Sequence, residues 1–164
     1  MTKQQLTLAQ LDARGIHYRV IYHSPVYTIE EMEQLELNQY GEIAKNLFLR
    51  NANGKTHYVV SMLKDKHPDI QADIRGQLGC SRLSFAPPEY MEKYLNCTPG
   101  SASVLGLVFD TECNVRLIID RDLLNESVIG CHPCINTSSL AINREKIIEK
   151  IIPATNHTPT YVEL

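Results

Sequence analysis

Three short segments hold the residues whose types and spacing could do chemistry. Lys45 stands at the start of an apolar run and is followed by Asn46. Thr98-Pro-Gly-Ser101 gathers small residues, and Cys131-His-Pro-Cys134 combines two thiols with an imidazole. A lysine can supply a fixed positive charge, and a small-residue loop can offer backbone N–H groups to an anion. A Cys/His group can bind zinc or carry out thiol chemistry.

Each segment also has a purely structural interpretation. Lys45 is suited to protect a strand edge, the loop after Thr98 to form a plain turn, and His132 to make a structural hydrogen bond. Structural zinc needs four ligands, and the cysteines at 80, 97 and 113 are isolated in sequence. Five cysteines without an export signal indicate reduced thiols. We therefore expect no metal and no cofactor, with a thiol or zinc protein as a weaker alternative.

The composition narrows the class of protein. The chain has 164 residues, of which 43% are hydrophobic and 21% charged, so we expect one globular domain over residues 1–164. No apolar run nears the ~20 residues that span a bilayer. The polar N-terminus is unlike a signal peptide, which predicts a cytosolic protein without a membrane partner. The net charge is −3, so any nucleic-acid contact must be local, and DNA is not an expected partner.

The elements that must position these segments are helices and β-hairpins in mixed order. Thr2 and Gln5 match a capping box for an N-terminal helix that ends near Gly15. Two β-rich runs surround Asn53-Gly54, which is a strong hairpin signal. Without strict βαβ alternation, the order predicts an α+β fold with a mixed, mainly antiparallel sheet. A second hairpin is predicted from 104–109 and 115–119, helices at 28–37, 69–78, 88–95 and 143–152, and strands at 17–23, 84–85, 127–131, 138–142 and 160–163.

Four motifs follow one another along the chain: Lys45-Asn-Leu-Phe-Leu-Arg50, Arg82-Leu-Ser-Phe85, Thr98-Pro-Gly-Ser101 with Gly106-Leu107, and Cys131-His-Pro133 with Asn136-Thr137. In their residues and their order they resemble the YbaK-like aminoacyl-tRNA deacylases, and most of all the freestanding prolyl-tRNA editing proteins. The resemblance extends over nearly the whole chain. It implies a sheet curled into a barrel-like core with flanking helices, and hydrolysis of the ester between a wrong amino acid and the terminal adenosine of tRNA.

The resemblance also implies roles for single residues. Catalytic roles fall to Lys45, Gly100, Ser101 and His132. The charge of Lys45 would serve the carbonyl oxygen or a phosphate, and the N–H groups of Gly100 and Ser101 would stabilise the oxyanion. The ribose 2′-hydroxyl of the substrate would orient the water, so Ser101→Ala is expected to be mild. Implied substrate-binding residues are Asn46, Ala102, Ser103, Gly130, Pro133 and Asn136.

The implied partner is the acceptor end of a mischarged proline tRNA, with prolyl-tRNA synthetase as a second candidate. Many relatives carry proline at the end of the glycine loop, where this chain has Val104. The difference leaves the amino acid open, so Ala-tRNA(Pro) is the expected substrate and Cys- or Ser-tRNA the alternatives. A non-catalytic binder of aminoacylated tRNA is a further alternative. Phosphate contacts are expected among Lys45, Arg50, Lys64, Lys66 and Arg82.

Overall fold

The computed structural model describes residues 1–22, 42–135 and 137–164 of the chain. The helix predicted at 28–37 lies outside these residues. The strands are β1 (Tyr18–Tyr22), β2 (Glu42–Asn51), β3 (His57–Leu63), β4 (Leu83–Phe85), β5 (Val115–Asp120), β6 (Val128–Cys131), β7 (Ser138–Asn143) and β8 (Thr160–Val162). The helices, with short 3-10 or π-type segments written η, are α1 (Lys3–Ala13), η2 (Ile70–Arg75), α3 (Gly76–Leu78), α4 (Pro88–Leu95), η3 (Val104–Phe109), η4 (Arg121–Asn125), α5 (Arg144–Lys146), η5 (Ile147–Ile151) and α6 (Ile152–Ala154).

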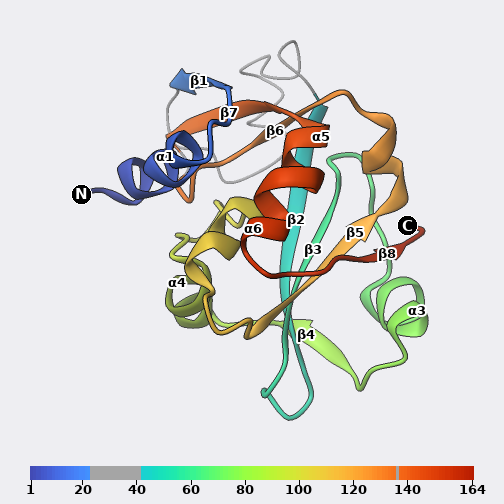
Figure 1. Ribbon diagram of the computed structural model, residues 1–164. Coiled ribbons are helices and arrows are strands. Elements are labelled where there is room, and N and C mark those ends of the chain that lie inside the picture. The colour runs from blue at the N-terminus through green and yellow to red at the C-terminus, as the bar shows by residue number, and fades with distance from the viewer. Residues whose placement is uncertain (23–41, 136) are drawn as a thin grey trace.

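Strand β2 runs through the centre of the molecule and joins the two halves of the sheet (Figure 1). The order is β1-β7-β6-β2-β3-β5-β8, with β4 also paired to β2. The pairs β1–β7, β6–β7, β2–β3 and β2–β4 are antiparallel, and β2–β6, β3–β5 and β5–β8 are parallel. The predicted mixed sheet is therefore confirmed. Its path runs from β1 to β8, and the described strands do not close into a barrel.

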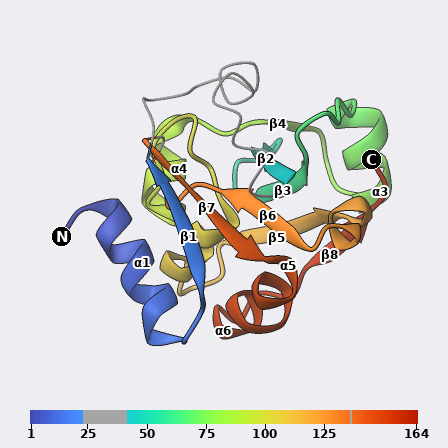
Figure 2. The same cartoon turned by 90° about the horizontal axis from the view of Figure 1, so that it is seen from above.

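Helices cover both faces of this sheet. Alternate residues of β2 point to opposite faces, so Phe48 belongs to the larger core cluster and Leu49 to the smaller one. The larger cluster includes residues from α1, α4, η3 and the C-terminal helices, and the smaller one includes Ile74 of η2. Seen from above, α6 and α3 lie on opposite sides of the sheet (Figure 2). No helix among the described residues is long and apolar enough to cross a bilayer.

Local signals set several of the element ends as predicted. The Thr2 side chain accepts a hydrogen bond from the Gln5 N–H at 3.1 Å, and the Thr2 N–H donates to the Gln5 side chain at 2.8 Å. This capping box begins α1, and Gly15 follows its end with a φ of 66°. The predicted hairpin around Asn53-Gly54 is the antiparallel pair β2–β3. These predictions are confirmed because each depends on neighbouring residues alone.

Residues 104–109 form the helix η3, so the prediction of a strand there was wrong. The Ser103 hydroxyl accepts from the Leu105 N–H at 3.1 Å and begins the helix. A Cβ on Gly106 would lie 2.7 Å from the Leu95 carbonyl oxygen, so only glycine lets η3 approach the end of α4 this closely. Packing against α4 thus overrides the β propensity of the segment.

Asp110 joins the end of η3 to the start of β5. Its carboxylate accepts hydrogen bonds from the Asn114 and Val115 N–H groups at 2.9 and 2.8 Å. The His157 Nε2 lies 2.9 Å from the same carboxylate, and its Nδ1 lies 2.8 Å from the Thr155 hydroxyl. The network is buried, so it anchors the C-terminal segment to the sheet.

Candidate functional site

One edge of β2 has two different neighbours with an unpaired stretch between them. Strand β6 pairs with the first two residues of β2, and β4 pairs with the last three. The Ala86 N–H adds a hydrogen bond of 3.0 Å to the Phe48 carbonyl. Among the described strands, none pairs with residues 44–47 on this edge. We call this stretch the opening, and it contains both Lys45 and Asn46.

Asn46 directs its backbone groups into the opening. In the β2–β3 pair, successive residues turn their N–H and C=O groups alternately to the two edges of the strand. The Ile43 carbonyl accepts from the Lys64 N–H on the β3 side, and the Phe48 carbonyl accepts from the Ala86 N–H on the other side. The backbone N–H and C=O of Asn46 face the same edge of β2 as those of Phe48, which is the edge away from β3. Among the described residues, these two groups of Asn46 therefore have no strand partner.

Lys45 lies on the opposite face of β2 from the Asn46 side chain. Its Nζ donates a hydrogen bond to the main-chain carbonyl of Lys66. Burial of the half-buried side chain lowers the pKa of Lys45, while the negative charge of Asp65 acts in the other direction. An ammonium has three donors. One is therefore fixed by the Lys66 carbonyl, and the remaining donors can serve a substrate.

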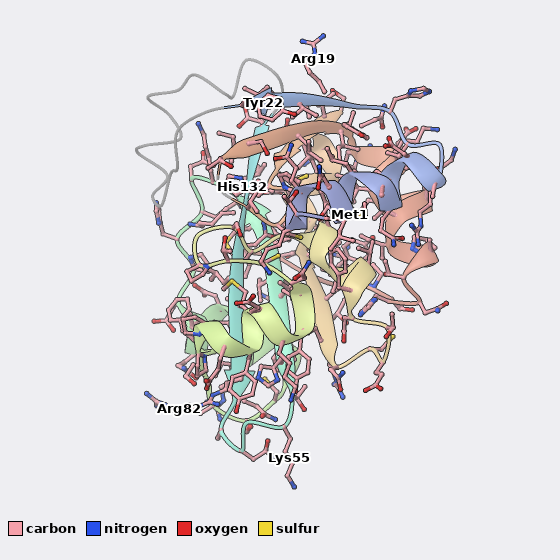
Figure 3. All side chains as sticks on the ribbon, turned by 90° about the vertical axis from the view of Figure 1, so that its left-hand side faces the viewer. Met1, Arg19, Tyr22, Lys55, Arg82 and His132 are labelled. Carbon is pink, nitrogen blue, oxygen red and sulfur yellow. The ribbon has the colours of Figure 1, made fainter. Side chains whose placement is uncertain are left out.

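His132 lies at the same end of the opening as Lys45. Ile43 of β2 pairs with Gly130 of β6 in a parallel arrangement, and Lys45 and His132 each lie two residues after this pair. Figure 3 shows His132 beside the upper part of β2. The His132 Nδ1 is 3.0 Å from the Ser138 main-chain carbonyl. Because a carbonyl only accepts, Nδ1 carries the proton, and in the neutral ring Nε2 carries the lone pair.

The Thr98–Ser103 loop lies against the His132 segment through a hydrogen bond from the Thr98 N–H to the Cys134 carbonyl at 3.4 Å. The Ser101 N–H donates to the Thr98 carbonyl at 3.0 Å, and the Ser101 hydroxyl donates to the same carbonyl at 2.7 Å. The predicted role of the Ser101 N–H as an oxyanion donor does not fit this geometry, because that donor already closes the turn. Gly100, which is exposed with a φ of 82°, remains as a candidate donor.

The other predicted substrate-binding residues surround these segments. Ser103 is buried and begins η3, and Ala102 beside it is half-buried. Pro133 is buried next to His132. Gly130 lies in β6, where an added Cβ would meet only ordinary contacts of 3.7 Å or more. Asn136 lies outside the described residues.

A cavity of about 20 Å³ lies behind the opening, on the other face of β2. Ala44, Asn46, Val104 and Cys131 line it, together with apolar residues of η4 and the C-terminal helices. Val104 directly follows the glycine loop and Cys131 directly precedes His132, so all three sequence motifs converge here. The Asn46 Oδ1 is buried and has no hydrogen-bond partner among the described residues. The volume suits one water molecule.

Lys66, whose main-chain carbonyl accepts the hydrogen bond from Lys45, is anchored by a group of charged side chains that the sequence did not reveal. The Lys66 ammonium donates to Asp122 and to the Leu164 carbonyl, each at 2.5 Å, and lies 3.5 Å from Asp120. Two of its donors thus have hydrogen-bond acceptors and Asp120 adds a third attraction between opposite charges, which makes Lys66 an anchor rather than an available phosphate ligand. Its partners are far away in the sequence, so no spacing pattern could have indicated them.

The other predicted phosphate ligands are dispersed over the molecule. The guanidinium carbon of Arg50 lies 5.7 Å from the centre of the Tyr90 ring. Arg82 lies at the opposite end of β2 from His132, near the Lys55 end of the hairpin (Figure 3). Arg50 and Arg82 therefore lie away from Lys45, whereas Lys64 lies close to it, because the Lys64 N–H donates to the Ile43 carbonyl.

The cysteines of the third motif are buried thiols. Burial raises the pKa of Cys131 to about 12, so it stays protonated at neutral pH. The thiols of Cys97 and Cys134 both point to the Leu95 carbonyl, at 3.4 and 3.7 Å. A hydrogen bond with Cys134, together with burial, raises the pKa of Cys97. In the parts of the chain that the structure describes, no three His, Cys, Asp or Glu side chains are grouped to hold a metal ion.

Several known proteins are similar to this chain in sequence or in fold. The family model of the aminoacyl-tRNA editing domain matches residues 23–150. The prolyl-tRNA editing protein ProX of Acetoanaerobium sticklandii is 37% identical, over 100% of this chain and 99% of its own. Prolyl-tRNA synthetase associated domain-containing protein 1 of Mus musculus is 30% identical, over 92% and 89%. A crystal structure provisionally described as a trans-editing enzyme for prolyl tRNA synthetase has a TM-score of 0.73 at 16% identity, covering 100% and 98%. The chain therefore belongs to the aminoacyl-tRNA editing domain family.

Proposed function

We propose that this protein is a trans-editing deacylase that hydrolyses the ester bond of mischarged prolyl-tRNA, with Ala-tRNA(Pro) as its substrate. Membership of the editing family supports the reaction class, and the name of the ProX relative supports prolyl-tRNA as the RNA. The observation that carries the proposal is the placement of Lys45 and His132 at one end of the opening in the sheet. Prolyl-tRNA synthetase is a candidate partner for handing over the substrate.

The chemistry needs only a positioned water and a stabilised oxyanion, because an aminoacyl ester is already activated. The Lys45 ammonium, fixed by the Lys66 carbonyl, provides positive charge for the ester carbonyl oxygen. The Asn46 N–H, which faces the opening, and the Gly100 N–H are the backbone donors for the same oxygen. His132, whose ring is held by the Ser138 main-chain carbonyl, orients the ribose. The 2′-hydroxyl of the substrate then orients the water.

Alanine is the expected amino acid because a synthetase pocket built for proline cannot strongly reject a smaller side chain. Each missing methylene is worth only about 1–3 kcal/mol of discrimination. A second pocket that admits alanine and excludes proline by size corrects the error. Val104 occupies the position of the loop proline found in many relatives, so serine and cysteine are the competing side chains to test.

A deacylation panel tests this function. Proline tRNA charged with Ala, Ser, Cys or Pro is incubated with the purified protein, and the remaining ester is measured over time. We expect Ala-tRNA to be cleared fastest and Pro-tRNA to be spared. Lys45→Ala should lose at least ~100-fold in rate, the scale of one lost electrostatic contact. Lys55→Ala, at the tip of the hairpin, is the matched control. Tight binding of all four RNAs without turnover would instead make the protein a non-catalytic binder.

A further inference from the structure

Phe85 is a large aromatic side chain left in solvent beside the opening. Its side chain is 62% exposed, whereas Leu83, two residues earlier on the same strand, is buried in the smaller core. Strand β4 is short and pairs only with β2 among the described strands. Phe85 is its last residue, so the ring stands where β4 leaves the sheet and the opening begins.

Phe85 and Lys45 share one face of the sheet. Leu49 lies directly opposite Phe85 in the β2–β4 pair. Residues 45 and 49 of β2 are an even number apart, so their side chains point to the same face. At about 3.4 Å per residue, roughly 14 Å of strand separates Lys45 from the position of Phe85. The opening thus has Lys45 and His132 at one end and an exposed aromatic ring at the other.

We propose that Phe85 is a stacking platform for the unpaired nucleotides that precede the terminal adenosine of tRNA. This inference rests on the proposed function and names the path of its substrate. The 3′ strand runs along the opening from Phe85 to Lys45, with the ester at Lys45. Bases stack on aromatic rings whatever their identity, and the unpaired end of a tRNA presents them without a pairing partner.

For an RNA substrate, the charges of the molecule favour stacking as a mode of binding. The net charge is −3, and the Lys66 ammonium is already bound by protein acceptors, so it does not add an ion pair with a phosphate near the site. Stacking supplies affinity without positive charge. The exposed Arg82 precedes β4 and provides one cation for the backbone of the same strand. A purely apolar protein partner would gain nothing from the Asn46 backbone groups that face the opening.

A tryptophan at position 85 tests the contact directly. The chain has no tryptophan, so Phe85→Trp places a single indole fluorophore at the proposed platform. The variant is titrated with an uncharged acceptor-stem RNA that ends in its three unpaired nucleotides, and with the same stem lacking them. We expect saturable quenching by the first RNA only. Equal responses to both RNAs, or no response to either, would overturn the proposal, and neither outcome depends on turnover.

Kinetics then separate the platform from the catalytic end. We expect Phe85→Ala to raise KM for a charged acceptor-stem RNA on the order of tenfold with little change in kcat, and Phe85→Trp to restore it. With alanyl-adenosine, which lacks the preceding nucleotides, Phe85→Ala and the wild type should be equal. Leu6→Ala, on the exposed side of α1, is the control. An equal loss on alanyl-adenosine would contradict the platform, whereas a wild type inactive on both substrates would contradict the proposed function.

Discussion

The side chain of Lys45 donates a hydrogen bond to the main-chain carbonyl of Lys66, 21 residues further along the chain. The Lys66 side chain is itself held by Asp122, Asp120 and the Leu164 carbonyl. The contacts of the Lys66 ammonium therefore help to fix the Lys66 carbonyl, which in turn orients the Lys45 ammonium. A catalytic group is useful only when its geometry is fixed, so under the proposed mechanism we expect Lys66 to be a positioning residue for Lys45.

The first prediction concerns Lys66. We expect Lys66→Met to lower kcat about 10- to 100-fold with little change in KM, because Lys45 keeps its charge but loses its fixed orientation. Asp122→Asn should act in the same direction and more weakly, since Asp120 and the Leu164 carbonyl remain. Lys55→Met is the matched control on an exposed site. If Lys66→Met lowers the melting temperature but leaves kcat unchanged at a temperature where it is folded, Lys66 has only a structural role.

The second prediction uses the pKa of Lys45, which burial lowers from its usual 10.5. Deacylation that depends on the ammonium should decline at a lower alkaline pH than an ordinary lysine would give. The stability of the fold should instead increase with pH. Between the folded and the unfolded pKa the unfolded state binds more protons, so the free energy of unfolding rises with pH. The effect is small because the side chain is half exposed.

Urea unfolding of the wild type and Lys45→Met, compared from about pH 8 to pH 10.5, measures this difference. The wild type should gain stability relative to the variant as the pH rises. A relative loss of stability over the same range would mean that the protein stabilises the ammonium, and that burial does not dominate its environment.

Local sequence signals anticipated much of this fold. The capping box at Thr2, the turn at Asn53-Gly54 and the glycine after α1 each act within a few residues, and the structure confirms all three. The strand prediction at 104–109 failed because the close approach of Gly106 to Leu95 is a tertiary contact. A β-rich composition carries no information about such a contact.

For the candidate site, too, local sequence signals were informative and non-local contacts could not be predicted. The residue types at Lys45 and His132 could be selected from the sequence, but their placement at one end of the opening depends on the Ile43–Gly130 register, which is non-local. The anchoring of Lys66 by Asp122 joins residues 56 positions apart. The exposed ring of Phe85 becomes informative only once β4 is known to stop beside the opening.

The third prediction concerns the stability of Ser101→Ala, a change whose expected effect on the deacylation rate is mild. The Ser101 side chain is fully buried, accepts from the Thr98 N–H at 3.0 Å and donates to the Thr98 carbonyl at 2.7 Å. Its removal leaves the Thr98 N–H with only its longer hydrogen bond to the Cys134 carbonyl and should cost about 0.5–1.5 kcal/mol of unfolding free energy. Ser84→Ala, on the exposed side of β4, is the control and should change stability little. Denaturant unfolding of both variants measures this difference. If Ser101→Ala is as stable as Ser84→Ala, the Ser101 side chain contributes little to the stability of the loop.

The last prediction concerns the nucleophile. The serines of the glycine loop are buried and hydrogen-bonded, since Ser101 closes the turn at Thr98 and Ser103 accepts from the Leu105 N–H. Burial raises the pKa of the Cys131 thiol to about 12, so it is not a thiolate at neutral pH. These side chains are unsuited to attack an ester, so we expect water to be the nucleophile and the ribose 2′-hydroxyl to orient it.

Ala-tRNA that ends in 2′-deoxyadenosine should therefore bind about as tightly as the natural substrate and be hydrolysed at least ~100-fold more slowly, the scale of a lost general acid–base contribution. Single-turnover hydrolysis with enzyme in excess measures the chemical step, and competition by the uncharged RNA measures binding. The same deoxy substrate without enzyme corrects for spontaneous ester loss. Rapid enzymatic hydrolysis of the deoxy ester would overturn the role of the 2′-hydroxyl. An acyl group trapped by acid quench on Ser101, Ser103 or Cys131 would show that a side chain of the protein attacks the ester and that water does not.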